Sequence, residues 1–435
     1  MIVRFVYTLL LTIVAPLFLY GLFKAKPGKP SVGKRWREHF GWTPKLATSD
    51  KPVVWFHAVS VGETLAVTPL IKQFASENPD TQIVITTTTP TGAEQAEKLS
   101  DIATHRYMPL DFGFAIKRFL RLIKPSQMVI VETELWPNTL HIVAKAGVPI
   151  TVINARLSER SCRRYQKVQP LFNVIAPTIS TLCCQFDDDA SRFERLGIAP
   201  ERIQVTGSIK FDIQITDKQI EQGKALRKQL GQDRPVWIAA STHDGEDEQV
   251  LTVHKQLLQN HPELLLIVVP RHPERFESVA KLCKDQGFGA MKRTELNSVL
   301  SSETSVVLGN TMGEMMSYLA ASDVCFMGGS LLGKKVGGHN LLEPAALGLP
   351  VLTGPSYFNF TDITEQLVEN DGAIICQDTE QISIAVSKLI EQSSLATEMG
   401  IACKQVVNRN QGALRHTLDR LSSFHITEKT NPKSL

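Results

Sequence analysis

The sequence predicts an α/β protein built from two Rossmann-like domains, each with a parallel sheet. Short apolar strands alternate with helical patterns along most of the 435 residues, and this alternation is typical of parallel sheets with helices on both faces. The chain is also longer than one hydrophobic core normally supports. The strand candidates fall into two successive series of similar size, so we expect two domains of this kind.

The predicted strands are short apolar runs bounded by turn residues. In the first series they are Val53–Phe56, Gln82–Thr87, Met128–Val131, Ile150–Ile153, Thr181–Cys184 and Gln204–Thr206. In the second series they are Val236–Ala240, Leu264–Val269, Ser305–Leu308, Val324–Met327, Val351–Leu352 and Ala373–Ile375. The polar stretch from Asp212 to Gly223 is predicted to be the linker, and the tail after Phe424 is predicted to be a frayed end.

Composition narrows the class of protein. Apolar residues make up 43% and charged residues 21% of the chain, which is ordinary for a folded globular protein. The net charge of +3 is too small to indicate nucleic-acid binding by itself. None of the seven cysteines forms a CxxC pair, so we expect buried thiols in a reducing compartment.

The N-terminus predicts a membrane anchor. Phe5 to Phe23 is 19 residues without a charge, and as a helix it would extend roughly 28 Å, about the hydrocarbon thickness of a bilayer. Basic residues follow at 24, 26, 29, 34, 35 and 37, against a single Arg4 in front. This asymmetry predicts that the bulk of the chain is cytoplasmic. A cleaved signal peptide and a helix lying flat in the interface remain alternatives.

Glu63 is the first candidate for catalysis. The strand Val53–Phe56 is followed by small residues up to Gly62 and then by Glu63, at the start of a helical pattern. Open α/β proteins bind anionic ligands at such turns. We expect the helix dipole to lower the pKa of Glu63, which makes it a charged general base. The alternative is that Glu63 only complements the helix N-terminus, and the pattern alone does not separate the two.

Other strand ends of the first half also carry polar residues. The run 86–92, TTTTPTG, offers hydroxyl groups, although a helix cap with a proline turn explains it equally well. Glu132 and Glu134 follow the strand Met128–Val131, where such folds place functional groups. Lys210 follows the last strand of this half, although a lone lysine is usually only solvated.

The second half carries a stronger pattern. Arg271 follows a buried strand and can pair with a phosphate or a carboxylate. The runs 309–314 and 327–330 are glycine-bearing turns after strands. Gly337 and Gly338 precede a helical pattern, and Glu343 lies in its expected first turn. Glycines there let a phosphate approach backbone N–H groups, and Glu343 can instead hold a ribose hydroxyl pair.

These motifs resemble those of glycosyltransferases with the GT-B fold, and more closely those of the 3-deoxy-D-manno-octulosonic acid (Kdo) transferases. The resemblance covers nearly the whole chain, and its motifs occur in the order of that family. They are HAVSVGET (57–64), ETELWPN (132–138), NARLSERS (154–161), TGSIKFD (206–212), VPRHPERF (269–276), NTMGE (310–314) and GGHNLLEP (337–344). One departure is Asn310, where the family usually has Asp.

The resemblance implies roles for single residues. Glu63 matches the catalytic base, and Glu132 and Lys210 match positions that stabilise the transition state. The site for the CMP part of the donor, CMP-Kdo, is matched by Pro270, Arg271, Met312, Gly313, Glu314, Asn340, Leu341, Leu342 and Glu343. The residues alone do not favour Glu132 over Glu134.

The resemblance also implies an activity. We expect an inverting transfer of Kdo from CMP-Kdo to the lipid A precursor, lipid IVA, at the cytoplasmic side of the bacterial inner membrane. We expect no cofactor and no metal, and the acidic runs 187–189 and 244–248 are more simply helix caps. The alternatives are a transferase of nucleotide-diphosphate sugars, a sugar-nucleotide epimerase or a non-catalytic lipid-binding protein tethered to the membrane.

The predicted domain organisation is the GT-B architecture, in which two Rossmann-like domains face a central cleft. Its segments are an anchor (1–23), a basic juxtamembrane segment (24–39), an N-terminal acceptor domain (40–211), a linker (212–224), a C-terminal donor domain (225–407), a C-terminal helix (408–424) and a tail (425–435). The resemblance implies that the C-terminal helix crosses back to the N-terminal domain, and Leu414, Leu418 and Leu421 have the spacing of one helix face.

Overall fold

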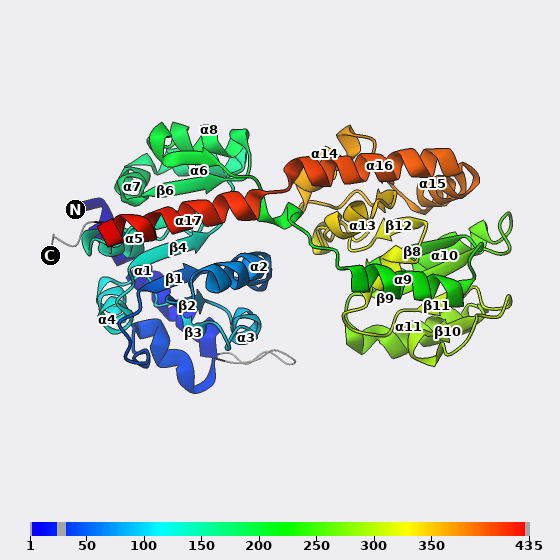
Figure 1. Ribbon diagram of the computed structural model, residues 1–435, viewed down its shortest axis with the longest axis horizontal. Coiled ribbons are helices and arrows are strands. Elements are labelled where there is room, and N and C mark those ends of the chain that lie inside the picture. Colours follow the sequence, from blue (N-terminus) through cyan, green and yellow to red (C-terminus); the bar gives the residue numbers. More distant parts are fainter. Residues whose placement is uncertain (1, 24–31, 431–435) are drawn as a thin grey trace. The chain divides into compact units, whose positions relative to one another are not determined.

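The computed structural model describes residues 2–23 and 32–430 and divides into two compact α/β units (Figure 1). Unit 1 comprises residues 1–210 and 411–435, and unit 2 comprises residues 211–410. Each unit has one seven-stranded sheet in which all strand pairs are parallel. The predicted architecture of two parallel α/β domains is therefore confirmed.

The sheet of unit 1 has the strand order β3-β2-β1-β4-β5-β6-β7. Its strands are β1 (Val53–His57), β2 (Gln82–Thr87), β3 (Thr104–Tyr107), β4 (Gln127–Val131), β5 (Ile150–Ala155), β6 (Thr181–Cys184) and β7 (Ile203–Val205). The chain builds outward from β1 in one direction and then returns to add β4 on its other side. This reversal makes the carboxyl ends of β1 and β4 the topological switch point, where open α/β sheets bind ligands.

The helices of unit 1 cover both faces of this sheet. They are α1 (Ile2–Phe23), α2 (Val61–Glu77), α3 (Pro90–Glu97), α4 (Gly113–Ile123), α5 (Pro137–Lys145), α6 (Glu159–Lys167), α7 (Gln169–Ile175), α8 (Asp187–Arg195) and α17 (Ala413–Thr430). Short 3₁₀ helices are η1 (Gly33–Phe40), η2 (Ala176–Thr178), η3 (Pro200–Arg202) and η4 (Ile209–Phe211).

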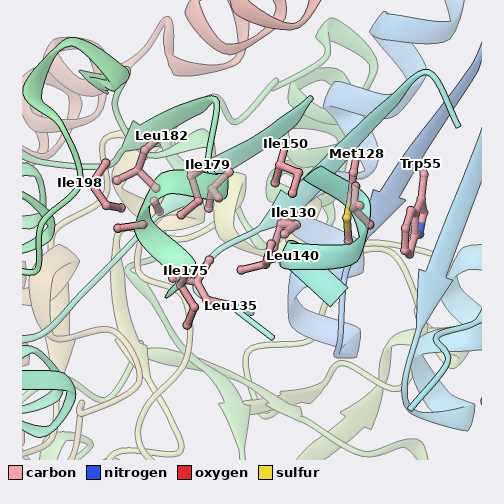
Figure 2. Close-up of a cluster of buried hydrophobic side chains, with 14 of the residues drawn as sticks. Trp55, Met128, Ile130, Leu135, Leu140, Ile150, Ile175, Ile179, Leu182 and Ile198 are labelled. Atoms are coloured by element: carbon pink, nitrogen blue, oxygen red, sulfur yellow. The ribbon is translucent and has the colours of Figure 1, made fainter. Parts of the chain in front are cut away.

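The core of unit 1 lies on both sides of its sheet. Figure 2 shows one side, where Trp55, Met128 and Ile130 of the strands pack with Leu140 of α5. On the other side, strand residues pack against α2 and α17. Every residue of β1 is buried, as its continuous apolar run predicted.

Unit 2 repeats this arrangement with the strand order β10-β11-β9-β8-β12-β13-β14. Its strands are β8 (Val236–Thr242), β9 (Leu265–Pro270), β10 (Ala290–Lys292), β11 (Val306–Leu308), β12 (Val324–Met327), β13 (Val351–Thr353) and β14 (Ala373–Ile375). The strand order reverses between β8 and β12, so the carboxyl ends of these two strands form the switch point of unit 2.

The helices of unit 2 flank its sheet. They are α9 (Asp217–Leu230), α10 (Asp247–Leu257), α11 (Phe276–Asp285), α12 (Met315–Ala320), α13 (Leu342–Leu347), α14 (Thr361–Glu369), α15 (Thr379–Glu391) and α16 (Ser393–Asn410), with 3₁₀ helices η5 (Pro273–Arg275), η6 (Arg293–Glu295) and η7 (Gly333–Lys335). The stretch 212–224, predicted to be a linker, contains the start of α9. The helix begins there because Thr216 and Gln219 form a reciprocal capping box.

The C-terminal segment forms two helices rather than one. Helix α16 ends at Asn410, and α17 begins at Ala413, after Gly412 with a φ of 99°. Leu414, Leu418 and Leu421 of α17 are buried in the core of unit 1. The chain therefore returns from unit 2 to complete unit 1.

The N-terminal segment forms the predicted helix, and α1 contacts α5 and α7. Arg4 Nε donates to Asn138 Oδ1 at 3.2 Å, and Asn138 Nδ2 donates to Thr8 Oγ1 at 2.9 Å. Within residues 2–23 and 32–430, no helix has the length and apolarity needed to cross a bilayer. The predicted membrane-spanning anchor is thus not found. The basic segment 24–39 lies partly outside the described residues.

Candidate active site

Glu63 lies at the switch point of unit 1, in the first turn of α2. Ser60 is the N-cap of this helix, and its hydroxyl donates to Glu63 Oε1 at 2.9 Å. The backbone N–H of Val59 donates to Glu63 Oε2 at 2.8 Å. The motif therefore acts as a variant of the capping box, with Val59 N–H in place of the N-cap N–H. The carboxylate is held in one orientation by two donors, so capping and catalysis are compatible roles.

The environment raises the pKa of Glu63 to about 7. Burial is the largest cause, and the charges of Glu132 and Glu134 add to it, while the hydrogen bonds from Val59 and Ser60 act in the opposite direction. The expectation that the helix dipole lowers this pKa is wrong, because desolvation outweighs it. A carboxylate with a pKa near 7 is well suited to act as a general base at neutral pH.

Glu132, which acts electrostatically on Glu63, forms an ion pair with Lys210. Lys210 Nζ donates to Glu132 Oε1 at 3.2 Å, and each side chain is 27% exposed. Glu132 follows β4 with a φ of 60°, an uncommon conformation for a residue other than glycine. Glu134 instead accepts a hydrogen bond from Trp136 Nε1 at 2.9 Å. The structure thus distinguishes two carboxylates that the sequence leaves equivalent.

Asn154 is a further residue of this region that the sequence did not single out. It is buried in β5 and has a φ of 53°. Its Oδ1 accepts the backbone N–H of Ile209 at 3.2 Å, which fixes the turn that carries Lys210. It opens the motif NARLSERS, but no charge or spacing marks it there as a positioning residue.

The predicted donor residues of unit 2 lie at or after the carboxyl ends of β9, β11 and β12, on the same side of the sheet. Pro270 ends β9, and the backbone N–H of Arg271 donates to Thr242 O at 2.9 Å. The side chain of Arg271 is exposed. Burial raises the pKa of Glu343, while the charge of Arg271 lowers it. These two residues therefore interact electrostatically, although 72 positions separate them.

The segment before α13 leads into the predicted helix, and Glu343 lies in its first turn as expected. The helix begins only at Leu342 and has six residues, so its dipole is short. Asn340 Oδ1 accepts the N–H of Leu342 at 3.1 Å. The side chains of Leu341 and Leu342 are buried in the unit. Asn340 and Glu343 remain partly accessible, as does His339 of the same motif.

The turn after β11 presents an accessible backbone. Met312 is 70% exposed, and Gly313 has a φ of 84°. Glu314 accepts hydrogen bonds from the Thr311 hydroxyl and from Arg293 Nη2. Asn310 binds Thr294 through both its Oδ1 and its Nδ2, so the departure from Asp is accommodated by hydrogen bonding.

Two other sequence features have structural roles. In the threonine run, Thr89 caps α3 and accepts the N–H of Gly92 at 3.1 Å, as the alternative interpretation held. In the acidic run 187–189, Asp189 accepts the N–H of Leu157 at 2.8 Å. Over the described ranges, no group of three or more His, Cys, Asp or Glu residues could hold a metal ion.

Comparison with known proteins decides the family. Residues 34–213 match the family model "3-Deoxy-D-manno-octulosonic-acid transferase (kdotransferase)". The chain is 40% identical to the 3-deoxy-D-manno-octulosonic acid transferase of Haemophilus influenzae over 97% of this chain and 98% of that protein. The chain belongs to the Kdo transferase family. The enzyme of the same name from Bordetella pertussis is 31% identical over 97% of this chain and 99% of that protein.

Family membership makes this protein a glycosyltransferase that transfers Kdo in lipopolysaccharide biosynthesis. Among solved structures, UDP-GlcNAc 2-epimerase from Neisseria meningitidis is similar with a TM-score of 0.57, covering 86% of this chain and all of that one. The two sequences are only 15% identical, so this likeness shows the fold and gives no support to an epimerase activity.

Proposed function

We propose that the protein transfers Kdo from CMP-Kdo to lipid IVA with inversion, and that Glu63 is the general base. The observation that carries this proposal is the environment of Glu63. Its carboxylate is oriented by hydrogen bonds from Val59 and Ser60. Burial and the nearby negative charge of Glu132 raise its pKa to about 7. A base in that state accepts a proton from a sugar hydroxyl at neutral pH.

The proposed reaction is one displacement. Glu63 removes the proton of an acceptor hydroxyl while that oxygen bonds to the ketosidic carbon of Kdo. The bond from this carbon to the phosphate oxygen breaks, and its electron pair leaves with CMP. Lys210 is held in place by Glu132. Its positive charge is proposed to stabilise the negative charge that develops on the leaving phosphate in the transition state.

The residues of unit 2 are proposed to bind the CMP part of the donor. Arg271 is exposed and suited to a phosphate, and Glu343 is suited to the ribose hydroxyls. Pro270, Met312–Glu314 and Asn340–Leu342 shape the surrounding turns. No cofactor or metal enters this mechanism, because a single phosphate carries little charge and cationic side chains can balance it.

The proposal is tested by mass spectrometry of lipid IVA incubated with the protein and CMP-Kdo. We expect products heavier by whole Kdo residues, formed equally well in the presence of EDTA. Uridine diphosphate sugars in a parallel reaction should give no product. Transfer from such a sugar but not from CMP-Kdo would contradict the proposed donor. Loss of activity in EDTA with recovery on adding Mg²⁺ would contradict the metal-free mechanism.

The rate of transfer should depend on pH through Glu63. Below its raised pKa the carboxyl group is protonated and cannot accept the hydroxyl proton. We therefore expect kcat/KM for the acceptor to rise with pH up to about 7. The measurement is a pH series at fixed ionic strength. A rate that is constant from about pH 5 to 8 would exclude a base with this pKa.

We also propose that the protein binds the cytoplasmic face of the bacterial inner membrane through α1, lying in the interface. One side of α1 carries Arg4 and Thr8, which bind Asn138. The other side carries exposed apolar residues, namely Ile2, Phe5, Val6, Leu9, Leu10, Ile13 and Val14. A docked helix with such a face, followed in sequence by six basic residues, is typical of interfacial attachment.

Replacing Phe5, Leu9 and Ile13 with Ser should weaken binding to anionic vesicles without unfolding the protein, because all three side chains are exposed. Vesicle flotation in high salt isolates the apolar contribution, since salt screens the basic residues. The matched control replaces Ile384 and Ile401 of unit 2, which are also exposed. Equal flotation of the α1 variant and the control would exclude α1 as the attachment.

A further inference from the structure

Three histidines meet at the switch point of unit 2. His243 follows β8, His272 follows β9 and His339 precedes α13. The ring planes of His243 and His339 are nearly parallel, 9° apart, and the two rings meet at their Nε2 atoms, which lie 2.8 Å apart. The ring of His272 stands edge-on to His243, with 5.4 Å between centroids. No sequence motif predicts a role for any of these three rings.

The contact between the two Nε2 atoms requires a proton. At 2.8 Å, one nitrogen must carry a hydrogen and the other must accept it. The pair can hold this proton with both rings neutral, or it can take up a second proton and carry a positive charge. Imidazole is the side chain whose charge changes most readily near neutral pH.

The backbone around the pair is fixed by a buried carboxylate. Glu246 is fully buried and accepts the backbone N–H groups of His243, Gly329, Ser330 and Leu331, at distances from 2.6 to 3.0 Å. A Cβ at Gly329 would lie 2.9 Å from His339 Nε2, so only glycine fits beside the pair. The surrounding backbone therefore holds the two rings in fixed positions.

The charges that face the pair are mostly positive. Arg271 and His272 act on both rings, and Arg275 acts on His243. Glu246 acts in the opposite direction on His243, and Arg271 also reaches Glu343. Burial is the largest cause that lowers the pKa of each ring, and for His339 the pKa falls to about 4. Without a ligand, the two rings are therefore neutral at pH 7. A bound anion would favour the protonated form of the pair and so raise its pKa.

We propose that the His243–His339 pair takes up one proton when the donor phosphate binds and then hydrogen-bonds the phosphate oxygen that leaves with CMP. This inference rests on the proposed function, in which CMP-Kdo is the donor. As the bond between the ketosidic carbon and the phosphate oxygen breaks, its electron pair gives the phosphate a second negative charge. The proton held by the pair then lies between imidazole and phosphate, whose pKa values are both ordinarily about 6.

The test is calorimetric titration of the full chain in two buffers of different ionisation enthalpy. The probe is the methyl ester of CMP, because its phosphate diester does not titrate near neutral pH. We expect uptake of about one proton per bound ligand at pH 7, and loss of this uptake in His243→Gln and His339→Gln. The control His261→Gln lies on another part of unit 2 and should retain it. Binding without proton uptake in the unaltered chain would overturn the proposal, whatever the variants do.

A kinetic measurement separates a catalytic role from a structural one. In the unaltered chain kcat should fall above the pKa of the liganded pair, and the two variants should lose this alkaline limb while keeping the acidic limb set by Glu63. We expect their kcat to fall by about 10²-fold or more. Transfer of Kdo with an unchanged alkaline limb in both variants would contradict the role of the pair alone. Failure of the unaltered chain to bind CMP or transfer Kdo would instead contradict the proposed function.

Discussion

Replacing Glu63 with Gln is expected to lower Kdo transfer by about 10²–10⁴-fold, the usual contribution of a general base. The amide is nearly isosteric and can keep a hydrogen bond from Val59 or Ser60, so the turn before α2 should stay in place. The loss should therefore appear in kcat, while the affinity for CMP-Kdo, measured by calorimetry, stays unchanged.

The same variant should not be destabilised at neutral pH. The pKa of Glu63 is raised in the folded chain, so folded protein binds more protons than unfolded protein between the ordinary pKa and about 7. Its contribution to stability is present at low pH and declines as pH rises through this range. Glu77→Gln, on the same helix, is the control for losing a carboxylate on α2. A folded Glu63→Gln protein with most of its activity would exclude the base.

Ending the chain at Asn410 is expected to unfold unit 1 while leaving unit 2 folded. The deletion removes α17, whose Leu414, Leu418 and Leu421 are buried in the core of unit 1. Burying three leucine side chains contributes about 5–9 kcal/mol, comparable to the whole stability of a typical domain. Hydrogen exchange with mass spectrometry should show rapid exchange in β1, β2 and β4 and continued protection in β8, β9 and β12.

Single substitutions give a graded form of this test. Leu418→Ala should destabilise unit 1 by about 2–5 kcal/mol, because the side chain is fully buried. His416→Ala on the exposed side of α17 should change the stability by less than about 0.5 kcal/mol. Equal denaturation curves for Leu418→Ala and His416→Ala would show that α17 does not support unit 1.

Buried strands were predictable because their apolar runs are continuous. Every strand proposed from the sequence is present, with ends that agree within two residues. The two strands that the sequence missed, β3 (THRY) and β10 (AMK), are the outermost strands at one edge of each sheet. Edge strands are covered on fewer sides, so their side chains need not be apolar. The capping box at Thr216, in contrast, was a readable signal within the stretch assigned to the linker.

The residues of the candidate site could be predicted from the sequence, but their pKa shifts and hydrogen-bond partners could not. The position of Glu63 follows from a strand-turn-helix pattern, but the direction of its pKa shift depends on burial, which the pattern does not give. The choice of Glu132 over Glu134 depends on tertiary contacts, because Glu132 pairs with Lys210 whereas Glu134 accepts a hydrogen bond from Trp136. The contact between His243 and His339 joins residues 96 positions apart, and only the order of strands brings them together.

The central claim is a single displacement assisted by Glu63, and the stereochemistry of the product tests it most directly. The measurement is the anomeric configuration of the transferred Kdo by nuclear magnetic resonance, compared with that of the same sugar in CMP-Kdo. A single displacement predicts a product of opposite configuration, because the acceptor oxygen attacks the face away from the leaving phosphate. A product with the configuration of the donor would require a covalent intermediate or a front-side attack, and it would contradict the account.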